Sequence, residues 1–266
     1  MIDPADPLFA AVLADPDSDE ARLALARTLR ERGDLQGQLI ELQTKSLRER
    51  RKYGPTPDYQ RMHLRARELL RVHADDWTTS IRGLATHPIL LRGLVEGVTI
   101  EANRFLAVAP ALYKVAPIRQ LVLLDTGDAI TEIANSPYLA QLVSLIFYNR
   151  SKSAPIGDAG AKALAASPHV GRLERLGLDN NDLGAEGVDA IAGSKSLKNL
   201  IYVGLGGNRV PSPVETYGTD PMTGGVASSS CALDADGLAL EAKYGRLAWL
   251  HAPSQLYNFP PDDSDF

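Results

Sequence analysis

The chain has 266 residues, of which 44% are apolar, so it can build a sizeable core, and its length allows one or two domains. The net charge of −5 is unremarkable, and the single cysteine, Cys231, excludes an intramolecular disulfide framework. No apolar run approaches the roughly 18 residues of a membrane span, and the acidic N-terminal segment lacks the basic start of a secretory signal. These features predict a cytoplasmic protein with no membrane partner.

The first ninety residues carry the patterns of amphipathic helices joined by short connections. Asp6 precedes Pro7 at a first helical position, and Asp17 with Glu20 has the spacing of a capping box. The expected helices cover residues 7–13, 17–33, 35–52 and 58–72. Since each has one apolar stripe, we expect them to pack as a small bundle, and residues 1–88 are predicted to form a helical N-terminal domain.

A basic stretch lies within this helical region. Residues 44–71 hold nine Lys or Arg and three Asp or Glu. This composition favours the solvated face of a helix pair, and it leaves nucleic-acid binding as an alternative. Tyr53 and Tyr59 are the only aromatic residues among these basic groups, which weakens the case for stacking on single strands.

A different pattern begins after the helices, and it is clearest in the stretch LERLGLDNNDLGAEG, residues 173–187. Its apolar positions step by three, two and five residues, which matches neither a helix nor a simple strand. The pattern L-x-x-L-x-L-x-x-N-x-L of leucine-rich repeats accounts for it. In that pattern a short strand is followed by a turn, here at Asn181, and a returning helix.

The pattern recurs, as a repeat architecture requires. The equivalent strand positions are separated by 23, 24, 31 and 27 residues, and they are Val98, Leu121, Leu145, Leu176 and Val203. The turn positions that follow them are Asn103, Thr126, Arg150, Asn181 and Asn208. Ala-rich helical segments lie between the strands. The sequence therefore predicts an α/β fold, a leucine-rich repeat solenoid with a curved parallel sheet, in which residues 89–210 form about five repeats.

Several phrases of the chain resemble those of one bacterial family. The phrase ARTLRERGDLQGQLIELQ, within residues 6–43, is similar to the "ADWLEERGD…AEFIRLQ" phrase of the repeat-companion domain. Two further phrases resemble landmarks of that family, ELLRVHADDW at 68–77 and LLRGLVEGVTI at 90–100. The chain departs from the usual form at Arg27 and Thr28, where the family has Asp and Trp.

The resemblance covers about residues 6–210. It implies a helical module ahead of leucine-rich repeats of the ribonuclease-inhibitor-like type, together with a generic binding role. It brings no established activity and therefore no catalytic residues.

The repeat pattern ends before the last segment, 211–266. Residues 211–231 are rich in Pro, Gly and Ser and predict a long loop. Residues 233–253 predict a helix and an apolar strand-like piece that caps the last repeat. The chain then continues into the acidic tail NFPPDDSDF.

The sequence offers little evidence of chemistry. The five histidines are scattered without metal-ligand spacing, and Cys231 has no identified histidine partner. GLGGN at 204–208 falls on repeat positions that already explain it. We therefore expect no catalytic residues, no metal and no cofactor. The alternative is an enzyme, or an accessory subunit of one, that uses the 211–231 loop.

The most distinctive expected surface is the inner face of the sheet. Alternation along the strands predicts a partner-binding set of Thr99, Glu101, Val122, Leu124, Asp125, Ile146, Tyr148, Asn149, Asp179 and Asn180. Four of these residues form an apolar stripe, namely Val122, Leu124, Ile146 and Tyr148, and the polar members form a rim. Glycines at 177, 204 and 206 are expected to let a partner approach the backbone.

This surface predicts a non-enzymatic scaffold that binds a protein or peptide. Tyr148 is the candidate anchor, and Lys or Arg of the partner would face Asp125 and Asp179. Two other occupants remain open: the chain's own helical or C-terminal segments, and a second copy of the chain in a homo-oligomer.

Overall fold

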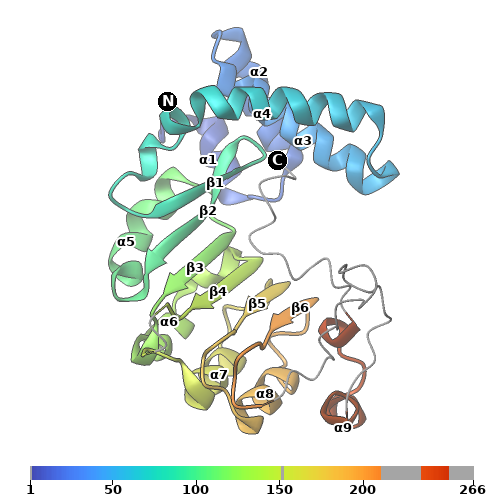
Figure 1. Ribbon diagram of the computed structural model, residues 1–266. Helices are drawn as coiled ribbons and strands as arrows, with labels where there is room; N and C mark the ends of the chain where they lie inside the picture. The colour runs from blue at the N-terminus through green and yellow to red at the C-terminus, as the bar shows by residue number, and fades with distance from the viewer. Residues whose placement is uncertain (1, 151–152, 211–234, 252–266) are drawn as a thin grey trace, which may run out of the picture. The chain divides into compact units, whose positions relative to one another are not determined.

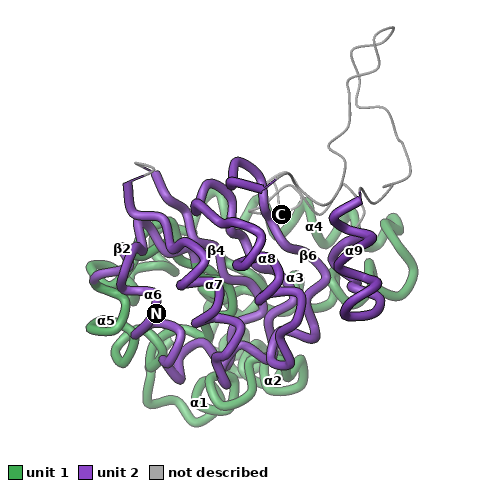
Figure 2. Tube along the Cα trace, turned by 90° about the horizontal axis from the view of Figure 1, so that it is seen from below, with its two compact units in different colours: residues 1–100, 104–121, 260–266 green, residues 101–103, 122–259 purple. Residues whose placement is uncertain are grey.

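The computed structural model describes residues 2–150, 153–210 and 235–251, and it has a mixed α/β fold (Figure 1). A six-stranded, mostly parallel sheet runs in the order β1-β2-β3-β4-β5-β6. The described residues divide into two compact units, 2–100 with 104–121, and 101–103 with 122–251 apart from the gaps (Figure 2). The α/β prediction is confirmed. The predicted 211–231 loop with Cys231, and the acidic tail, lie outside the described residues.

The four predicted N-terminal helices are confirmed. They are α1 (Pro7–Ala14), α2 (Asp19–Glu31), α3 (Leu35–Tyr53) and α4 (Pro57–Trp77). Each begins at a residue whose side-chain oxygen accepts a backbone N–H of the first turn, in order Asp6, Ser18, Asp34 and Thr56. The start of α2 is therefore capped by Ser18 rather than by the expected Asp17. Consecutive helices pack on one another.

Two apolar clusters hold the first unit together. One joins α1, α2 and α3 to strand β2 (Leu94–Glu101), through Phe9, Val12, Leu25, Ala26, Leu29, Ile40 and Leu94. The other joins α3 to α4 through Leu39, Ala66 and Leu69. Because α3 has buried residues in both clusters, it is the central helix of this unit.

The sheet begins with a hairpin that the repeat pattern does not predict. Strands β1 (Thr86–Leu91) and β2 (Leu94–Glu101) pair antiparallel, so the expectation of a purely parallel sheet is wrong at this edge. The cause is the two-residue turn Arg92-Gly93, in which both residues have positive φ, 48° and 77°. Such a turn matches the twist of antiparallel strands.

The hairpin turn is fixed to α3. Gln43 Oε1 accepts the Gly93 N–H at 2.6 Å, and Gln36 Nε2 donates to the Gly93 carbonyl at 3.2 Å. A Cβ on Gly93 would lie about 2.5 Å from Ile40 Cα, which only glycine avoids. The first compact unit therefore extends beyond the predicted domain boundary at residue 88.

A buried ionic cluster lies beside the same turn. The Glu96 carboxylate binds Arg22 Nη2 at 2.9 Å, and it also receives Nε and Nη2 of Arg92 at 3.0 and 2.9 Å. Both arginines donate to the carbonyl of Pro16. Burial lowers the pKa of Arg22 to about 10 and raises the pKa of Glu96, so removal from water outweighs their mutual attraction.

Strands and helices alternate through the rest of the described chain. In order they are α5 (Ala102–Val115), β3 (Gln120–Leu124), α6 (Ile130–Ala134), β4 (Ser144–Tyr148), α7 (Gly157–Ala166), β5 (Arg175–Gly177), α8 (Ala185–Ala192) and β6 (Tyr202–Gly204). The pairs β4–β5 and β5–β6 are parallel, and Leu176 pairs with Leu145 on one side and with Val203 on the other. The predicted equivalence of these three positions is confirmed.

Asparagine side chains connect the turns that follow these strands. Asn181 Nδ2 donates to the carbonyls of Phe147 and Asp179, each at 2.9 Å, and its Oδ1 accepts the Ile156 N–H. Asn208 repeats the arrangement one strand further, since its Nδ2 donates to the carbonyl of Leu178 and its Oδ1 accepts the Asn181 N–H. Each asparagine thus replaces backbone partners that a turn leaves unpaired.

The turn after β4 differs from the expected alignment. The predicted turn position is Arg150, which is exposed, whereas the preceding residue Asn149 is buried. Asn149 Nδ2 donates to the Asn180 carbonyl at 3.1 Å, and its Oδ1 accepts the Ala154 N–H at 3.2 Å. Asn149, one residue before the predicted turn position, therefore makes the turn contacts after β4.

The helices of the second unit are linked by side chains as well. Asp158 at the start of α7 accepts the N–H groups of Gly184 and Gly187, which caps α8 from its neighbour. Ser167 and Ser194 donate to carbonyls of the preceding helices, those of Ala134 and Ala165. These contacts repeat from one helix to the next.

The last described segment of the second unit packs on α8 and β6. Helix α9 (Ala235–Tyr244) contacts α8, where Lys243 Nζ lies 2.7 Å from Asp189 Oδ1. The expected strand-like piece is instead a 3-10 turn, Ala248–His251, that packs against β6. This turn buries both Trp249 and Leu250, whereas a strand would point consecutive side chains to opposite faces.

Candidate interaction surface

The strands of the second unit present two different faces. One face is buried and carries Leu145, Phe147, Leu176, Leu178, Val203 and Leu205. Alternation places Ile146, Tyr148, Gly177, Asp179, Gly204 and Gly206 on the other. We call this second set the strand face.

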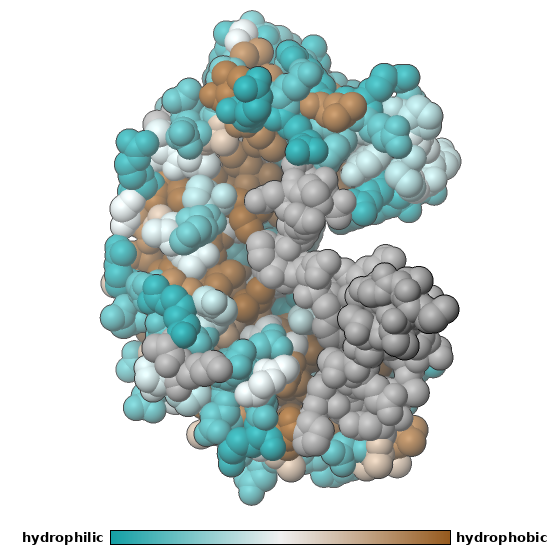
Figure 3. Space-filling view, in the orientation of Figure 1, coloured by the Kyte–Doolittle hydropathy of each residue, from teal (hydrophilic) through white to brown (hydrophobic). Residues whose placement is uncertain are grey.

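The apolar part of the strand face is narrower than the predicted stripe. Tyr148 is 56% exposed, whereas Leu124 is only 9% exposed. Val122 and Ile146 are half-buried. In the space-filling view, apolar patches over the region of β3 and β4 are interrupted by polar groups (Figure 3). Of the four residues of the predicted stripe, Tyr148 is therefore the one whose side chain is largely exposed.

The glycines of the strand face do not leave the backbone open, in contrast to the expectation for them. A Cβ on Gly177 would lie 3.0 Å from Ile146 Cγ2. A Cβ on Gly204 would overlap Asp179 Oδ2, and one on Gly206 would lie 2.9 Å from Asp179 Oδ1. The space is filled by side chains that lean across from the preceding strand, so these glycines position Ile146 and Asp179.

Asp179 is the most distinctive charge on this face. Its Oδ1 accepts the Gly206 N–H at 2.7 Å, and partial loss of hydration raises its pKa although the side chain still reaches solvent. Within the part of the chain that the structure describes, no cation forms an ion pair with it. A carboxylate that is partly dehydrated and unneutralised is suited to receive a cation from outside.

The other predicted acidic groups are neutralised within the chain. Arg150 Nη2 lies 2.9 Å from both Glu101 Oε1 and Asp125 Oδ2. The hydrogen bond with Asp125 is the largest of the causes that raise the pKa of Arg150. The repeat pattern predicts only a turn at Arg150. The signal in the sequence for its ion pairs is that Glu101 and Asp125 stand at or just after the ends of two preceding strands, and Arg150 follows the end of the next one. Of the predicted acidic rim, Asp179 is the member left for a basic partner.

The remaining predicted residues have different positions. Asn149 is buried and both ends of its amide bind backbone groups, so it supports the turn rather than the rim. Asn180 is exposed with φ of 56°, and its N–H donates to the Gly206 carbonyl. Thr99 belongs to the first unit, is half-buried, and accepts the Thr86 hydroxyl at its carbonyl.

The raised pKa of Asp179 implies that its ionised carboxylate lowers the stability of the fold. Its folded-state pKa lies above the unfolded value, so ionised Asp179 destabilises the fold at neutral pH, and this cost disappears as the pH falls below the unfolded value. We expect Asp179→Asn to raise the midpoint of thermal unfolding at pH 7, because an amide oxygen can still accept the Gly206 N–H. The gain should shrink toward pH 4. A lower midpoint at pH 7 would contradict this account.

Comparison of the chain with protein families, with curated proteins and with solved structures found no match. The function is therefore inferred from the residues themselves. Among the described residues, no cluster of three or more His, Cys, Asp or Glu side chains is arranged to hold a metal ion. None of the described helices combines the length and the apolar character needed to cross a bilayer.

Proposed function

We propose that the protein is a non-enzymatic scaffold of the cytoplasm that binds a basic peptide segment of another protein on the strand face. In this proposal residues 89–210 form a leucine-rich repeat solenoid with a curved sheet, and residues 1–88 form its helical companion domain. Tyr148 supplies the apolar anchor and Asp179 receives a lysine or arginine of the partner.

The recurring contacts support the repeat architecture. The paired strand positions Leu145, Leu176 and Val203 are 31 and 27 residues apart. The serines that join neighbouring helices, Ser167 and Ser194, are also 27 residues apart. A period of 20–29 residues with an asparagine at the turn is typical of leucine-rich repeats, and the insertion at 150–155 accounts for the longer spacing of 31.

The observation that carries the binding proposal is the pair Tyr148 and Asp179. Ile146 pairs with Gly177, and extending this parallel register by two residues sets Tyr148 beside Asp179 on neighbouring strand lines about 4.8 Å apart. An exposed aromatic ring next to an unneutralised carboxylate suits a side chain with a long apolar stem and a cationic end. Lysine and arginine have this form.

Selection from a random peptide library displayed on phage tests the proposal. The native chain and the double variant Tyr148→Ala, Asp179→Asn would be used in parallel, with circular dichroism to check that both fold. We expect peptides enriched on the native chain to contain Lys or Arg. Their affinity, measured by fluorescence anisotropy, should fall about tenfold or more in the double variant, as for the loss of one close charge pair.

Glu132→Gln is the matched control, because Glu132 is an exposed residue of α6 and its change removes one negative charge from the same unit. It should leave the affinity unchanged. Peptides without basic residues, or an equal loss of affinity in the Glu132→Gln control, would contradict a site at Asp179.

A further inference from the structure

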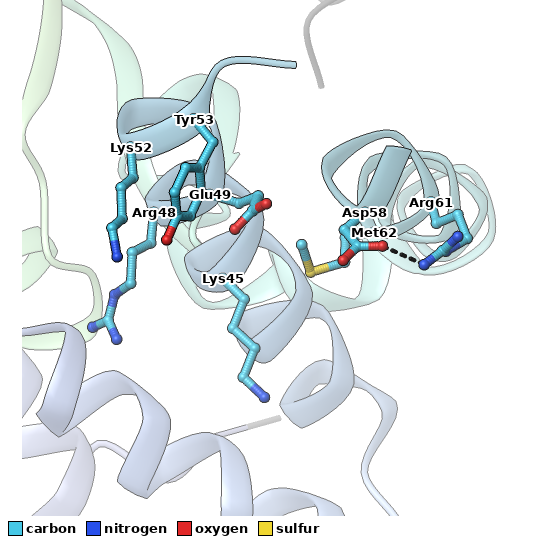
Figure 4. A pocket seen from close by; sticks show the side chains of 8 residues that line it. All are labelled: Lys45, Arg48, Glu49, Lys52, Tyr53, Asp58, Arg61 and Met62. Carbon is cyan, nitrogen blue, oxygen red and sulfur yellow. Dashed lines mark hydrogen bonds and ion pairs between the residues drawn. The ribbon is translucent and has the colours of Figure 1, made fainter. Parts of the chain in front are cut away.

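A hollow lies in the first unit, between α3 and α4 (Figure 4). Its volume is about 530 Å³, and it is lined by Lys45, Arg48, Glu49, Lys52, Tyr53, Asp58, Arg61 and Met62. Pockets of small organic ligands occupy roughly 300–1,000 Å³. The hollow, which we call the α3–α4 groove, is therefore large enough for more than a simple ion.

The groove has an excess of positive charge. Lys45, Arg48 and Lys52 are three and four residues apart along α3, which places them on one side of that helix. In the close view Arg48, Lys52 and Tyr53 extend in the same direction from α3 (Figure 4). With Arg61, the lining has four cations against two carboxylates.

The two carboxylates of the lining already have partners in the chain. Glu49 Oε1 accepts the Thr56 hydroxyl at 3.0 Å, and Asp58 forms an ion pair with Arg61. Because Glu49 binds Thr56 and Asp58 binds Arg61, neither carboxylate neutralises a cation of α3 in the described part of the chain.

The cations of α3 are only weakly held. Lys45 pairs with Glu41 at 2.5 Å and Arg48 with Asp19 at 3.1 Å, but both cationic side chains are more than half exposed, so these pairs contribute little. Lys52 forms no ion pair with any carboxylate among the described residues, and its Nζ lies 4.7 Å from the centre of the Tyr53 ring. A ligand with two negative charges can compete for all three cations.

The groove also offers apolar contact. Tyr53 is 61% exposed, and Met62 lines the groove from the facing helix α4. An aromatic ring can stack on a flat group, and a thioether adapts to it. This combination separates the α3–α4 groove from a merely basic surface.

We propose that the α3–α4 groove binds an organic phosphate of nucleoside diphosphate size. The phosphates lie against Lys45, Arg48 and Lys52, and the flat part of the ligand packs on Tyr53 and Met62. This site is separate from the strand face and does not depend on the scaffold function.

Isothermal titration calorimetry of the full chain with ADP tests the proposal, with adenosine and inorganic pyrophosphate as partial ligands. ADP should bind more tightly than either. The double variant Lys45→Gln, Lys52→Gln should weaken ADP binding about tenfold or more. Tyr53→Ala should weaken binding of ADP while leaving that of pyrophosphate unchanged. Circular dichroism verifies that each variant folds.

The variant Arg67→Gln, Arg71→Gln provides a control of equal charge. Both arginines are exposed residues of α4 within the same basic stretch, and neither lines the groove. This variant should bind ADP like the native chain. The proposal is overturned if the control loses as much affinity as the groove variant, since diffuse charge would then explain binding. It is equally overturned if ADP does not bind, or binds no better than pyrophosphate.

Discussion

Replacing Arg22 with methionine is expected to destabilise the protein by about 1.5–3 kcal/mol, the contribution of hydrogen bonds to a charged group, because Arg92 still binds Glu96. Arg22 is fully buried, and its Nη2 group contacts both the Glu96 carboxylate and the Pro16 carbonyl. Methionine keeps most of the volume but leaves the buried Glu96 with one cation instead of two. Urea unfolding followed by circular dichroism measures the free energy of unfolding.

The double variant Arg22→Met, Glu96→Met removes the buried pair itself and leaves Arg92 with Asp19 and the Pro16 carbonyl. Because dehydration already outweighs attraction in this cluster, removing both charges should cost less than removing Arg22 alone. Arg48→Met removes an exposed ion pair with Asp19 and should cost about 1 kcal/mol or less. A double variant less stable than the single one would show that the ionic cluster itself stabilises the fold.

Asn181→Ala is expected to lower the free energy of unfolding by about 3 kcal/mol. The side chain is 1% exposed, and its loss deprives two carbonyls and one N–H of their partners. An unsatisfied buried group costs roughly 1–3 kcal/mol, and partial relaxation keeps the total below the sum. Thermal and urea unfolding of the variant measure the loss.

Asn199→Ala is the control for this variant. Asn199 also donates to a backbone carbonyl, that of Gly171, but it is exposed, so water can replace it. Its removal should cost about 1 kcal/mol or less. Equal losses at Asn181 and Asn199 would contradict the view that buried turn asparagines hold successive strands together.

The sequence predicts the repeated elements well, because their signals are local and recur. The strand positions Leu145, Leu176 and Val203 are found in register, and Asn181 and Asn208 make the expected turn contacts. The antiparallel hairpin is missed because it depends on Arg92 in a left-handed conformation, which arginine rarely adopts.

The candidate site is predicted less completely, since it depends on side chains that are distant in the sequence. Arg150 lies 49 residues from Glu101 and 25 residues from Asp125 in the sequence, yet it binds both carboxylates. These ion pairs neutralise two acidic groups of the expected rim. The space that a side chain at Gly204 would occupy is filled by the carboxylate of Asp179, which follows the neighbouring strand. Similarly, the sequence shows the basic composition of residues 44–71. It does not show the groove, because the groove forms only where α3 packs beside α4.

Hydrogen exchange of the native chain, with and without a selected basic peptide, tests the proposed binding surface most directly. The strand face predicts slower exchange in residues 144–150 and 175–182 when the peptide is bound, with no change in α3 and α4. Protection confined to the first unit, or no protection despite saturation, would contradict the assignment of Tyr148 and Asp179 as the binding site.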